Sequence, residues 1–421
     1  MKNIFTESHK LNTVAIISRT DSSVSGSGVV AEELANLINQ SNLYQAHLWR
    51  GFSNLPKNEN TFELYGNNAG EFVYKLSRYL SRKSGLVDFI PFEILTHNLT
   101  KPFEYDLYHF HSISAAASPL FLRWAGTRKP TIWTFHECAP FTGGCIYPSV
   151  TDCHAYTNRC GQCPQLPMWP FLTPFDFTGF TQDYKRKLAR ENLFIPVVPS
   201  QWLAKEVVKS GMCEQEPIVI PNCVDTKSFV PTDKSQARAS LNLPHDRFII
   251  LIGAAFLSNE RKGMKYAVEA ISNLESQPYV IAVGGQSDDL KKQDFPIHCA
   301  GYIQDKAKLA LYYSAADLFL FPTLADNLPL VAIESMACGT PVIGFRTGGV
   351  PEIVDHEING WLVEQKDVPG LVSAINYVMS DSARLRLWAE NGLDKVRKCY
   401  NPNLFLARHL DLYESLLGSK Q

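Results

Sequence analysis

The chain has 421 residues, of which 45% are hydrophobic and 19% are charged, and its formal net charge is −2. This length is too great for one ordinary hydrophobic core and is typical of two domains of roughly 200 residues each. The composition excludes a disordered or collagen-like chain, and the balanced charge argues against nucleic acid as a partner because it provides no overall positive field.

The N-terminal residues and the apolar runs indicate the cellular compartment of the protein, and the compartment predicts the redox state of its cysteines. No apolar run reaches the roughly 18 residues that span a bilayer, and residues 1–13 lack the apolar stretch of a signal peptide. We therefore expect a cytoplasmic protein. Its ten cysteines should then be reduced and should not form a disulfide framework.

In chain order, the first predicted unit is a strand over 13–18, a glycine and serine loop, and a helix over 29–40. Further buried strands are predicted, each followed by polar or helical residues, over 107–111, 131–135, 194–199 and 217–220. This alternation predicts a parallel sheet covered by helices.

A polar stretch over 225–244 separates this pattern from a second one. The second pattern predicts strands over 248–253, 279–284, 316–321 and 341–345, and helices over 330–338 and 368–379. We predict an α/β protein with two doubly wound, Rossmann-like domains and an interdomain cleft. The domains are 1–225 and 226–402, and a C-terminal helix over 403–421 is expected to pack back on the first domain.

The segment over 321–349 combines the end of a strand, a polar turn and the start of a helix. Free backbone N–H groups at such a helix N-terminus suit an anion such as a diphosphate. Asp326 and Glu334 flank this position and could accept hydrogen bonds from sugar hydroxyls. A helix-capping Asp and a solvated Glu are the alternative interpretation. The N–H groups and side chains expected at the helix start belong to Asn327, Leu328 and Leu330.

The spacing of the two acids, followed by the letters ACGTPVI and a Gly-Gly turn, resembles the donor-site motif of the retaining glycosyltransferases of family 4. The resemblance implies a GT-B fold. It also implies that Glu334 binds the donor ribose and that Asp326 lies against the donor sugar. The first acid is Asp here, whereas Glu is commoner in the family.

Other matches to this family follow in order along the chain. They are SGSG at 25–28, VPSQW at 198–202, IPNCVD at 220–225, RKG at 261–263 and GYI at 301–303. The resemblance implies that Lys262 and Arg261 bind the diphosphate of a UDP- or GDP-sugar, while two exposed cations are the alternative. Many relatives have an Arg six residues before the Lys, where this chain has Phe256.

Three residues of the first domain are also candidates. Gly26 and Gly28, in the loop after the first strand, would let a ligand approach the backbone, although a plain turn would use them equally. His136 ends a predicted strand and should face the cleft. The resemblance implies that it contacts the donor sugar or supports the reaction, and a structural histidine is the alternative. His111 has a similar position.

Four cysteines gather in the loop over 141–166: Cys145, Cys153, Cys160 and Cys163. Four thiolates with one C-x-x-C pair suit a structural zinc site that fixes a loop without a core of its own. Reduced, unliganded thiols and disulfides are the alternatives. The loop resembles that of a subgroup linked to surface polysaccharide synthesis, in which it would shape the acceptor side.

Together with these features, the resemblance implies a retaining glycosyltransferase that uses a nucleotide sugar, and we expect it to need no catalytic metal. The resemblance implies a saccharide or lipid-linked saccharide as the acceptor. It also implies a peripheral association with the inner face of the membrane. A catalytically inactive protein that binds nucleotide sugars is the alternative from another class. A phosphorylase-like or epimerase-like enzyme is the other alternative, but no lysine motif of a pyridoxal site is visible.

Overall fold

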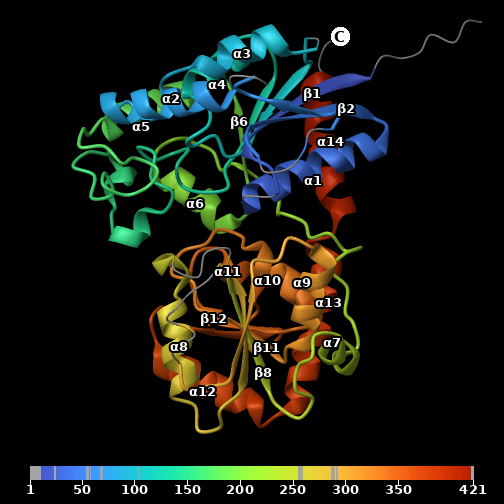
Figure 1. Cartoon of the computed structure of the whole chain (residues 1–421). Coiled ribbons are helices and arrows are strands. Elements are labelled where there is room, and N and C mark those ends of the chain that lie inside the picture. Colours follow the sequence, from blue (N-terminus) through green and yellow to red (C-terminus); the bar gives the residue numbers. More distant parts are fainter. Residues whose placement is uncertain are drawn as a thin grey trace, which may run out of the picture.

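The computed structural model describes residues 11–22, 25–53, 56, 58–66, 70–102, 104–254, 259–285, 290 and 293–418. Two α/β units stand one above the other in Figure 1, the first mostly blue to green and the second yellow to red. Each is built on a parallel sheet, so the predicted fold class of two doubly wound domains is confirmed.

The first sheet has the strand order β3-β2-β1-β4-β5-β6-β7, and its neighbouring strands pair in parallel. Its order reverses between β1 and β4, the position at which open α/β sheets leave a crevice for ligands. Its strands are β1 (Asn12–Thr20), β2 (Tyr44–Phe52), β3 (Thr61–Glu63), β4 (Leu107–Phe110), β5 (Thr131–Thr134), β6 (Ile195–Val198) and β7 (Ile218–Val219).

Alternate residues of β1 enter different cores, which shows that both faces of the sheet are covered. Ala15 and Ile17 pack with the helices α2 to α6, whereas Val14 and Ile16 pack with α1 and α14. The helices are α1 (Gly26–Ser41), α2 (Gly70–Ser84), α3 (Phe92–Thr100), α4 (Pro119–Gly126), α5 (Thr178–Arg190), α6 (Gln201–Lys209) and α14 (Pro402–Leu417).

The second sheet has the order β10-β9-β8-β11-β12-β13, again with parallel pairings. Its strands are β8 (Ile249–Ala254), β9 (Tyr279–Gly284), β10 (Ile297–Gly301), β11 (Leu318–Phe321), β12 (Val342–Phe345) and β13 (Gly360–Val363). One face packs against α7 (Lys234–Ser240), α9 (Lys306–Ala315), α10 (Leu330–Ala337) and α13 (Ser382–Cys399). The other packs against α8 (Met264–Ser272) and α12 (Val368–Met379).

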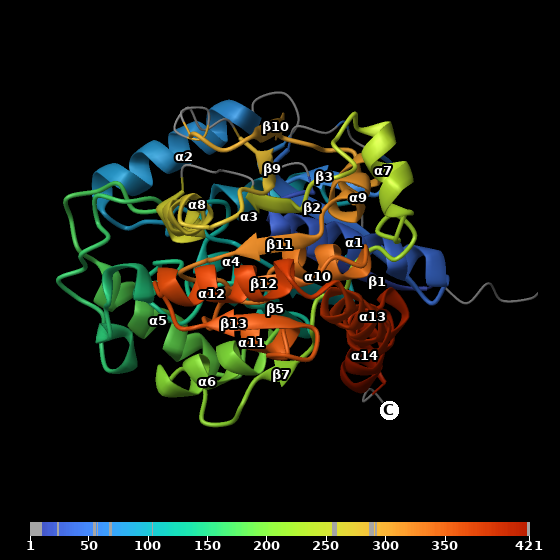
Figure 2. The same ribbon diagram turned by 90° about the horizontal axis from the view of Figure 1, so that it is seen from below.

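The C-terminal helix α14 returns to the first unit. In Figures 1 and 2 it leaves the second unit after α13 and lies beside α1 and β1. Phe405, Leu412 and Tyr413 enter the core that α1 forms with the first sheet. The helix begins at Pro402, and the side chain of Asn401 accepts a hydrogen bond from the N–H of Leu404. The predicted domain boundary between 225 and 226 stays a prediction.

Strands β2, β3, β10 and β13 were not predicted, and β2 shows why. Its sequence places Gln45, His47 and Arg50 among apolar residues, which hides the run typical of a buried strand. Arg50 is nevertheless buried, because it forms ion pairs with Asp21 at 2.5 Å and with Glu63 at 3.0 Å. Those partners are tertiary neighbours, so the local pattern could not show them.

Within the described part of the chain, no helix combines the length and apolar character needed to cross a membrane. The predicted location in the cytoplasm and the predicted association with the membrane surface stay predictions.

Candidate functional site

Two cavities lie where the carboxyl ends of strands from both sheets come together. The first, here the charged cavity, has a volume of ≈340 Å³ and is lined by residues from the ends of β1, β5, β8 and β11. The second, here the apolar cavity, has ≈330 Å³. Gly253, Leu330 and Val331 line both, so the cavities are adjacent. Parallel α/β sheets bind ligands at this edge.

The N-terminus of α10 opens onto the charged cavity. Pro329 stands at the N-cap and provides no side-chain hydrogen bond, so the first N–H groups of the helix lack a partner within it. Leu328, Leu330 and Val331 line the cavity at this point, together with Asn327. The helix therefore offers backbone donors and a partial positive charge to an anion.

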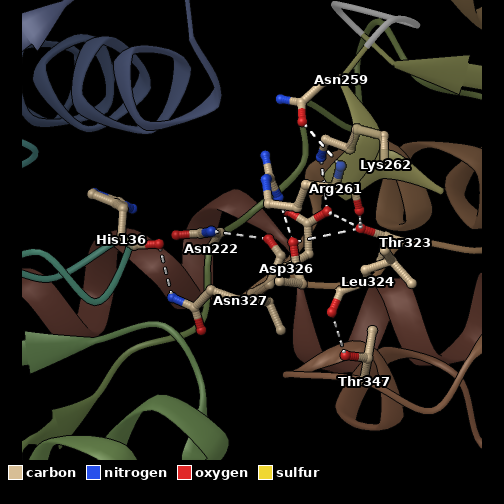
Figure 3. A network of polar contacts seen from close by, with 12 residues as sticks. His136, Asn222, Asn259, Arg261, Lys262, Thr323, Leu324, Asp326, Asn327 and Thr347 are labelled. Atoms are coloured by element: carbon tan, nitrogen blue, oxygen red, sulfur yellow. Dashed lines mark hydrogen bonds and ion pairs between the residues drawn. The ribbon is translucent and has the colours of Figure 1, made fainter. Parts of the chain in front are cut away.

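Two cations beside this helix are held by one carboxylate, as Figure 3 shows. Lys262 Nζ lies 2.7 Å from Asp326 Oδ2, and Arg261 Nη1 lies 3.1 Å from Asp326 Oδ1. Thr323 Oγ1 also donates to Asp326 Oδ2 at 2.9 Å. Both cations come from the short 3-10 helix Glu260–Lys262, which ends at Gly263. A Cβ on Gly263 would lie 1.8 Å from the carbonyl oxygen of Pro322, and its φ is +69°, so glycine is required for this approach.

This cluster carries a net positive charge. Burial by itself would raise the pKa of Asp326, but Lys262 and Arg261 outweigh burial and hold that pKa below its ordinary value. Asp326 is thus ionised and compensates one of the two cations. Burial lowers the pKa of Lys262, and Asp326 opposes that effect. A cluster of two cations and one anion beside a helix N-terminus is suited to a second anion.

His136 lies across the charged cavity and is joined to this cluster through the backbone. Its carbonyl oxygen accepts a hydrogen bond of 3.2 Å from Asn327 Nδ2, as drawn in Figure 3. Ser200 Oγ in turn donates to Asn327 Oδ1, and the same Ser200 caps α6 by accepting from the N–H of Leu203. The three residues connect the end of β5, the start of α6 and the turn before α10.

A stack of histidines supports His136 from inside the first sheet. His136 Nε2 lies 2.9 Å from His111 Nδ1, and the two rings stack with their centroids 5.1 Å apart. The ring of His109 follows at 4.5 Å from that of His111. His109 is hydrogen-bonded to Tyr413 of α14 and to Thr134 of β5, each at 2.7 Å.

His111 does not reach the cavity as its position in the sequence suggested. It is fully buried, and its Nε2 has no hydrogen-bond partner among the described residues. Burial lowers the pKa of His136 to about 3 and the pKa values of His109 and His111 well below their ordinary range. The three rings are therefore neutral at pH 7, and Nδ1 is the nitrogen that His136 keeps for a ligand.

Glu334 lies at the apolar cavity, one helical turn into α10. Tyr313 Oη donates to its Oε2 at 3.2 Å, and burial raises the pKa of Glu334 to about 7, against the opposing effects of Tyr313 and Lys306. The other walls are largely apolar and include Val29, Phe229, Leu251, Val283, Ile303 and Leu309. The cavity can take a flat apolar group, and Glu334, Glu33 and Asp225 line it as carboxylates that could accept hydrogen bonds from hydroxyls.

The two glycines of the first domain have different environments. Gly26 is the first residue of α1 and lines the charged cavity. Gly28 lines neither cavity, and a Cβ there would lie 2.0 Å from the carbonyl oxygen of Asp21. Of the two glycines that were expected to approach a ligand, only Gly26 lies at a cavity. Gly28 lacks a side chain because α1 packs closely against the end of β1 there.

The four loop cysteines line one small cavity of ≈10 Å³. The N–H of Gly143 donates to Cys160 Sγ at 3.2 Å, and burial raises the pKa of Cys145 to about 12 and that of Cys160 to about 11. All four are free cysteines. Within the described ranges, no three or more His, Cys, Asp or Glu side chains are arranged to hold a metal. Zinc therefore stays a prediction.

Arg19, Tyr147 and Trp169 are among the residues of the charged cavity that were not predicted as site residues. Arg19 lies at the carboxyl end of β1, so the rule that selected His136 at the end of β5 would have found it. Tyr147 and Trp169 lie in the long loop between β5 and α5, where no local pattern indicates direction. The predicted Phe256 difference lies outside the described residues.

Comparison with known proteins assigns both halves of the chain. A model of Glycosyltransferase Family 4 matches residues 24–228, and one of Glycosyl transferases group 1 matches residues 247–381. The chain belongs to the glycosyltransferases. The two matched ranges lie in the two α/β units that carry the facing walls of the charged cavity.

Curated relatives match over part of their length. D-inositol 3-phosphate glycosyltransferase 1 of Catenulispora acidiphila is 34% identical over 181 residues, which cover 38% of this chain and 43% of the relative. D-inositol 3-phosphate glycosyltransferase of Mycobacterium tuberculosis is 30% identical over 169 residues, covering 37% of this chain and 34% of the relative. The chain thus matches less than half the length of these relatives.

Solved structures match over nearly the whole fold. Sucrose-phosphate synthase from Thermosynechococcus elongatus has a TM-score of 0.72 at 21% identity, covering 97% of this chain and 100% of that one. HepE from Anabaena, in complex with UDP, has a TM-score of 0.66 at 15% identity, with 96% and 100% covered. These matches confirm the GT-B fold.

The ion cluster generates a first prediction. Asp326→Asn should lower the free energy of unfolding by about 1–3 kcal/mol, because Lys262 and Arg261 lose their buried carboxylate. Inorganic pyrophosphate should then raise the melting temperature more in the variant than in the unchanged protein, since Asp326 no longer competes with it. The control is Asp183→Asn, which removes an exposed ion pair with Arg159. Equal pyrophosphate effects would contradict this account.

The histidine stack generates a second prediction, which concerns the tautomer of His136. A buried N–H without a partner is rarer than a buried lone pair, so the unpaired His111 Nε2 should carry no hydrogen. His111 then donates from Nδ1 to His136 Nε2, and His136 carries its hydrogen on Nδ1. ¹⁵N NMR of the imidazoles at pH 7 should show this tautomer, and His111→Phe should turn His136 into a mixture. A His136 that carries its hydrogen on Nε2 would refute the assignment.

Proposed function

We propose that this chain is a retaining glycosyltransferase that moves a sugar from a nucleoside diphosphate sugar to an acceptor hydroxyl. The observation that carries the proposal is the junction of the two cavities at Gly253 and the start of α10. A nucleoside fits the apolar side, and a diphosphate fits the cationic side. A donor lying across the junction would meet both kinds of chemistry in the right order.

Each part of the donor has a partner in this arrangement. The base would lie among the apolar walls, and the ribose hydroxyls would bind Glu334. Lys262, Arg261 and the N–H groups at the start of α10 would bind the diphosphate. The sugar would then lie between His136 and Asp326. Structures of Anabaena HepE with UDP and with UDP-glucose support a uridine nucleotide as the first donor to try.

The transfer would use the leaving group itself as the base. The bond between the sugar C1 and the phosphate oxygen breaks, and the acceptor oxygen bonds to C1 on the same face. The acceptor proton passes to the departing phosphate oxygen. Lys262, Arg261 and the helix N-terminus stabilise the charge that grows on the diphosphate, so the proposal includes no catalytic metal and no covalent nucleophile.

The acceptor is proposed to be a saccharide or a lipid-linked saccharide, in the synthesis of a surface glycan. The curated relatives are named for D-inositol 3-phosphate, a polyol that carries phosphate. The long loop between β5 and α5, which supplies Tyr147 and Trp169 to the charged cavity, would form part of the acceptor side.

A panel of UDP-, GDP- and ADP-sugars tests the activity. One donor should release its nucleoside diphosphate slowly without an acceptor, and mass spectrometry of products should show transfer when saccharides are added. Lys262→Ala should reduce release by at least about tenfold, since it loses a charge-assisted contact in the transition state. Tight donor binding without any release would favour the alternative, a binding protein that has lost turnover.

The proposed donor site assigns the ribose to Glu334 and the diphosphate to Lys262, and variants of these two residues can test each assignment separately. Glu334→Gln should weaken the binding of both UDP and uridine. Lys262→Ala should weaken the binding of UDP by about tenfold or more and leave that of uridine nearly unchanged, because the removed ammonium group binds only the phosphates. Calorimetric titration measures both. Unchanged uridine affinity in Glu334→Gln would remove the ribose assignment.

The raised pKa of Glu334 adds a pH dependence. A carboxylate accepts hydrogen bonds from both ribose hydroxyls only when it is ionised, so uridine affinity should rise from pH 6 to pH 8, through the pKa of about 7. Glu334→Gln should lose this rise. A pH profile that is the same in both proteins would show that Glu334 does not contact the nucleoside.

We also propose that the loop cysteines hold a structural zinc ion, for which the described thiols would have to draw closer together than they lie in this structure. Four thiols line a cavity of ≈10 Å³, which has room for about one water-sized particle, and one of them already accepts a backbone N–H. Metal emission spectroscopy should find close to one zinc per chain, lost in Cys163→Ser with a lower melting temperature. Cys399→Ser, at an exposed cysteine, is the control. An equally stable, metal-free protein would leave the thiols as packing residues.

A further inference from the structure

The wall of the charged cavity that faces α10 and the ion cluster belongs to the first unit. It contains Arg19 from the end of β1 and Glu137 from the turn after β5. Tyr147 and Trp169 complete it from the loop between β5 and α5. The proposed donor uses the opposite wall and His136, and Tyr147 already stacks on Arg261, so Arg19, Glu137 and Trp169 remain for a second ligand.

Arg19 differs from the two cations of the second unit. Lys262 and Arg261 both pair with Asp326, whereas no carboxylate lies within ion-pair distance of Arg19 in the described part of the chain. The guanidinium instead lies 4.9 Å from the centre of the Trp169 ring. Stacking on an aromatic ring fixes the plane of a guanidinium and leaves its N–H groups free to bind an anion in the same plane.

Glu137 lines the same cavity and has one carboxyl oxygen without a partner in the described part of the chain. Its Oε1 is buried and has no hydrogen-bond partner among the described residues. Burial raises the pKa of this carboxyl, and the nearby Arg19 opposes that rise. A buried carboxyl oxygen without a partner is costly, and a ligand hydroxyl would satisfy it.

Trp169 supplies a surface for a ring. Its side chain is 43% exposed although it lies at the cavity, whereas Tyr147 is 7% exposed and holds Arg261 against its face at 4.9 Å. The exposed indole can pack against the apolar face of a sugar or cyclitol ring. The wall thus combines an aromatic surface, a carboxyl that can accept from hydroxyls and a guanidinium that forms no direct ion pair among the described residues.

We propose that Arg19, Glu137 and Trp169 form the acceptor subsite, and that the acceptor is a polyhydroxylated ring with an acidic substituent. Trp169 packs against the ring, Glu137 binds a hydroxyl, and Arg19 binds the carboxylate or phosphate. This inference rests on the proposed transferase function, and it names the chemical class of the second substrate. It also explains why a cation without a carboxylate partner lies on the wall away from the donor.

The test begins with donor binding alone. The full chain is first titrated with UDP, which reports on the proposed function independently of any acceptor. The UDP-saturated protein is then titrated, by saturation-transfer NMR at low ionic strength, with glucose, glucuronic acid and glucose 6-phosphate. These probes share a ring and differ in charge, and the two acids distinguish a carboxylate from a phosphate as the acidic group.

At least one acidic probe should bind tenfold or more tightly than glucose, because a charge-assisted contact to guanidinium is added. Arg19→Gln should remove this preference and leave UDP affinity within twofold, whereas Arg19→Lys should keep part of it. Arg123→Gln, which breaks an exposed pair with Glu191, should keep all of it. Glu137→Gln should weaken all three probes about equally.

Two results would overturn the inference. One is equal binding of the neutral and acidic probes to the unchanged protein that binds UDP. The other is a loss of UDP affinity in Arg19→Gln comparable with that in Lys262→Ala, which would assign Arg19 to the donor. Failure of the protein to bind any nucleotide would instead refute the proposed function, and it would be seen before a probe is added.

Discussion

The contact of Asp326 with Lys262 and Arg261 is the constraint on which the site depends. Two cations on one short turn would repel each other and would be costly to bury without a counter-charge. Asp326 supplies that charge and holds both side chains at the N-terminus of α10, where they add to the positive end of the helix. Because one carboxylate faces two cations, the cluster remains positive and can take an anion.

The backbone around this cluster leaves no room for variation. Gly263 must lack a side chain because Pro322 lies against it, and Gly348 must lack one because a Cβ there would lie 1.8 Å from the carbonyl oxygen of Asp326. Thr323 completes the set by donating to Asp326. The position of the cations is thus fixed by close packing between the ends of β8, β11 and β12, and not by the ion pairs alone.

The same edge of the second sheet also positions the first unit. The carboxylate of Glu352, in α11 (Val350–Ile353), accepts from the N–H groups of Gln201 and Trp202 at 2.9 and 2.7 Å, so it caps α6 across the two units. Asn327 binds Ser200 and the carbonyl of His136. These contacts set the width of the charged cavity, and any separation of the units must break them.

The sequence by itself determined the parts of this protein that depend on local patterns. Apolar strands alternating with helices predicted two parallel sheets, and the Pro329 turn predicted a helix start at the edge of a sheet. The order of the motifs along the chain predicted the family, which the two matched domains bear out at the level of glycosyltransferases. These features are encoded within stretches of a few residues.

Tertiary structure alone decided how polar groups were satisfied. The buried Arg50 of β2 needed Asp21 and Glu63, the buried His111 needed His136, and Gly28 needed the carbonyl of Asp21. Arg19 and Trp169 are 150 residues apart and meet only because a long loop folds back over β1. A pattern along the chain records which residues are apolar, but a buried charge is identified by its partner in space, and that partner is set by the fold.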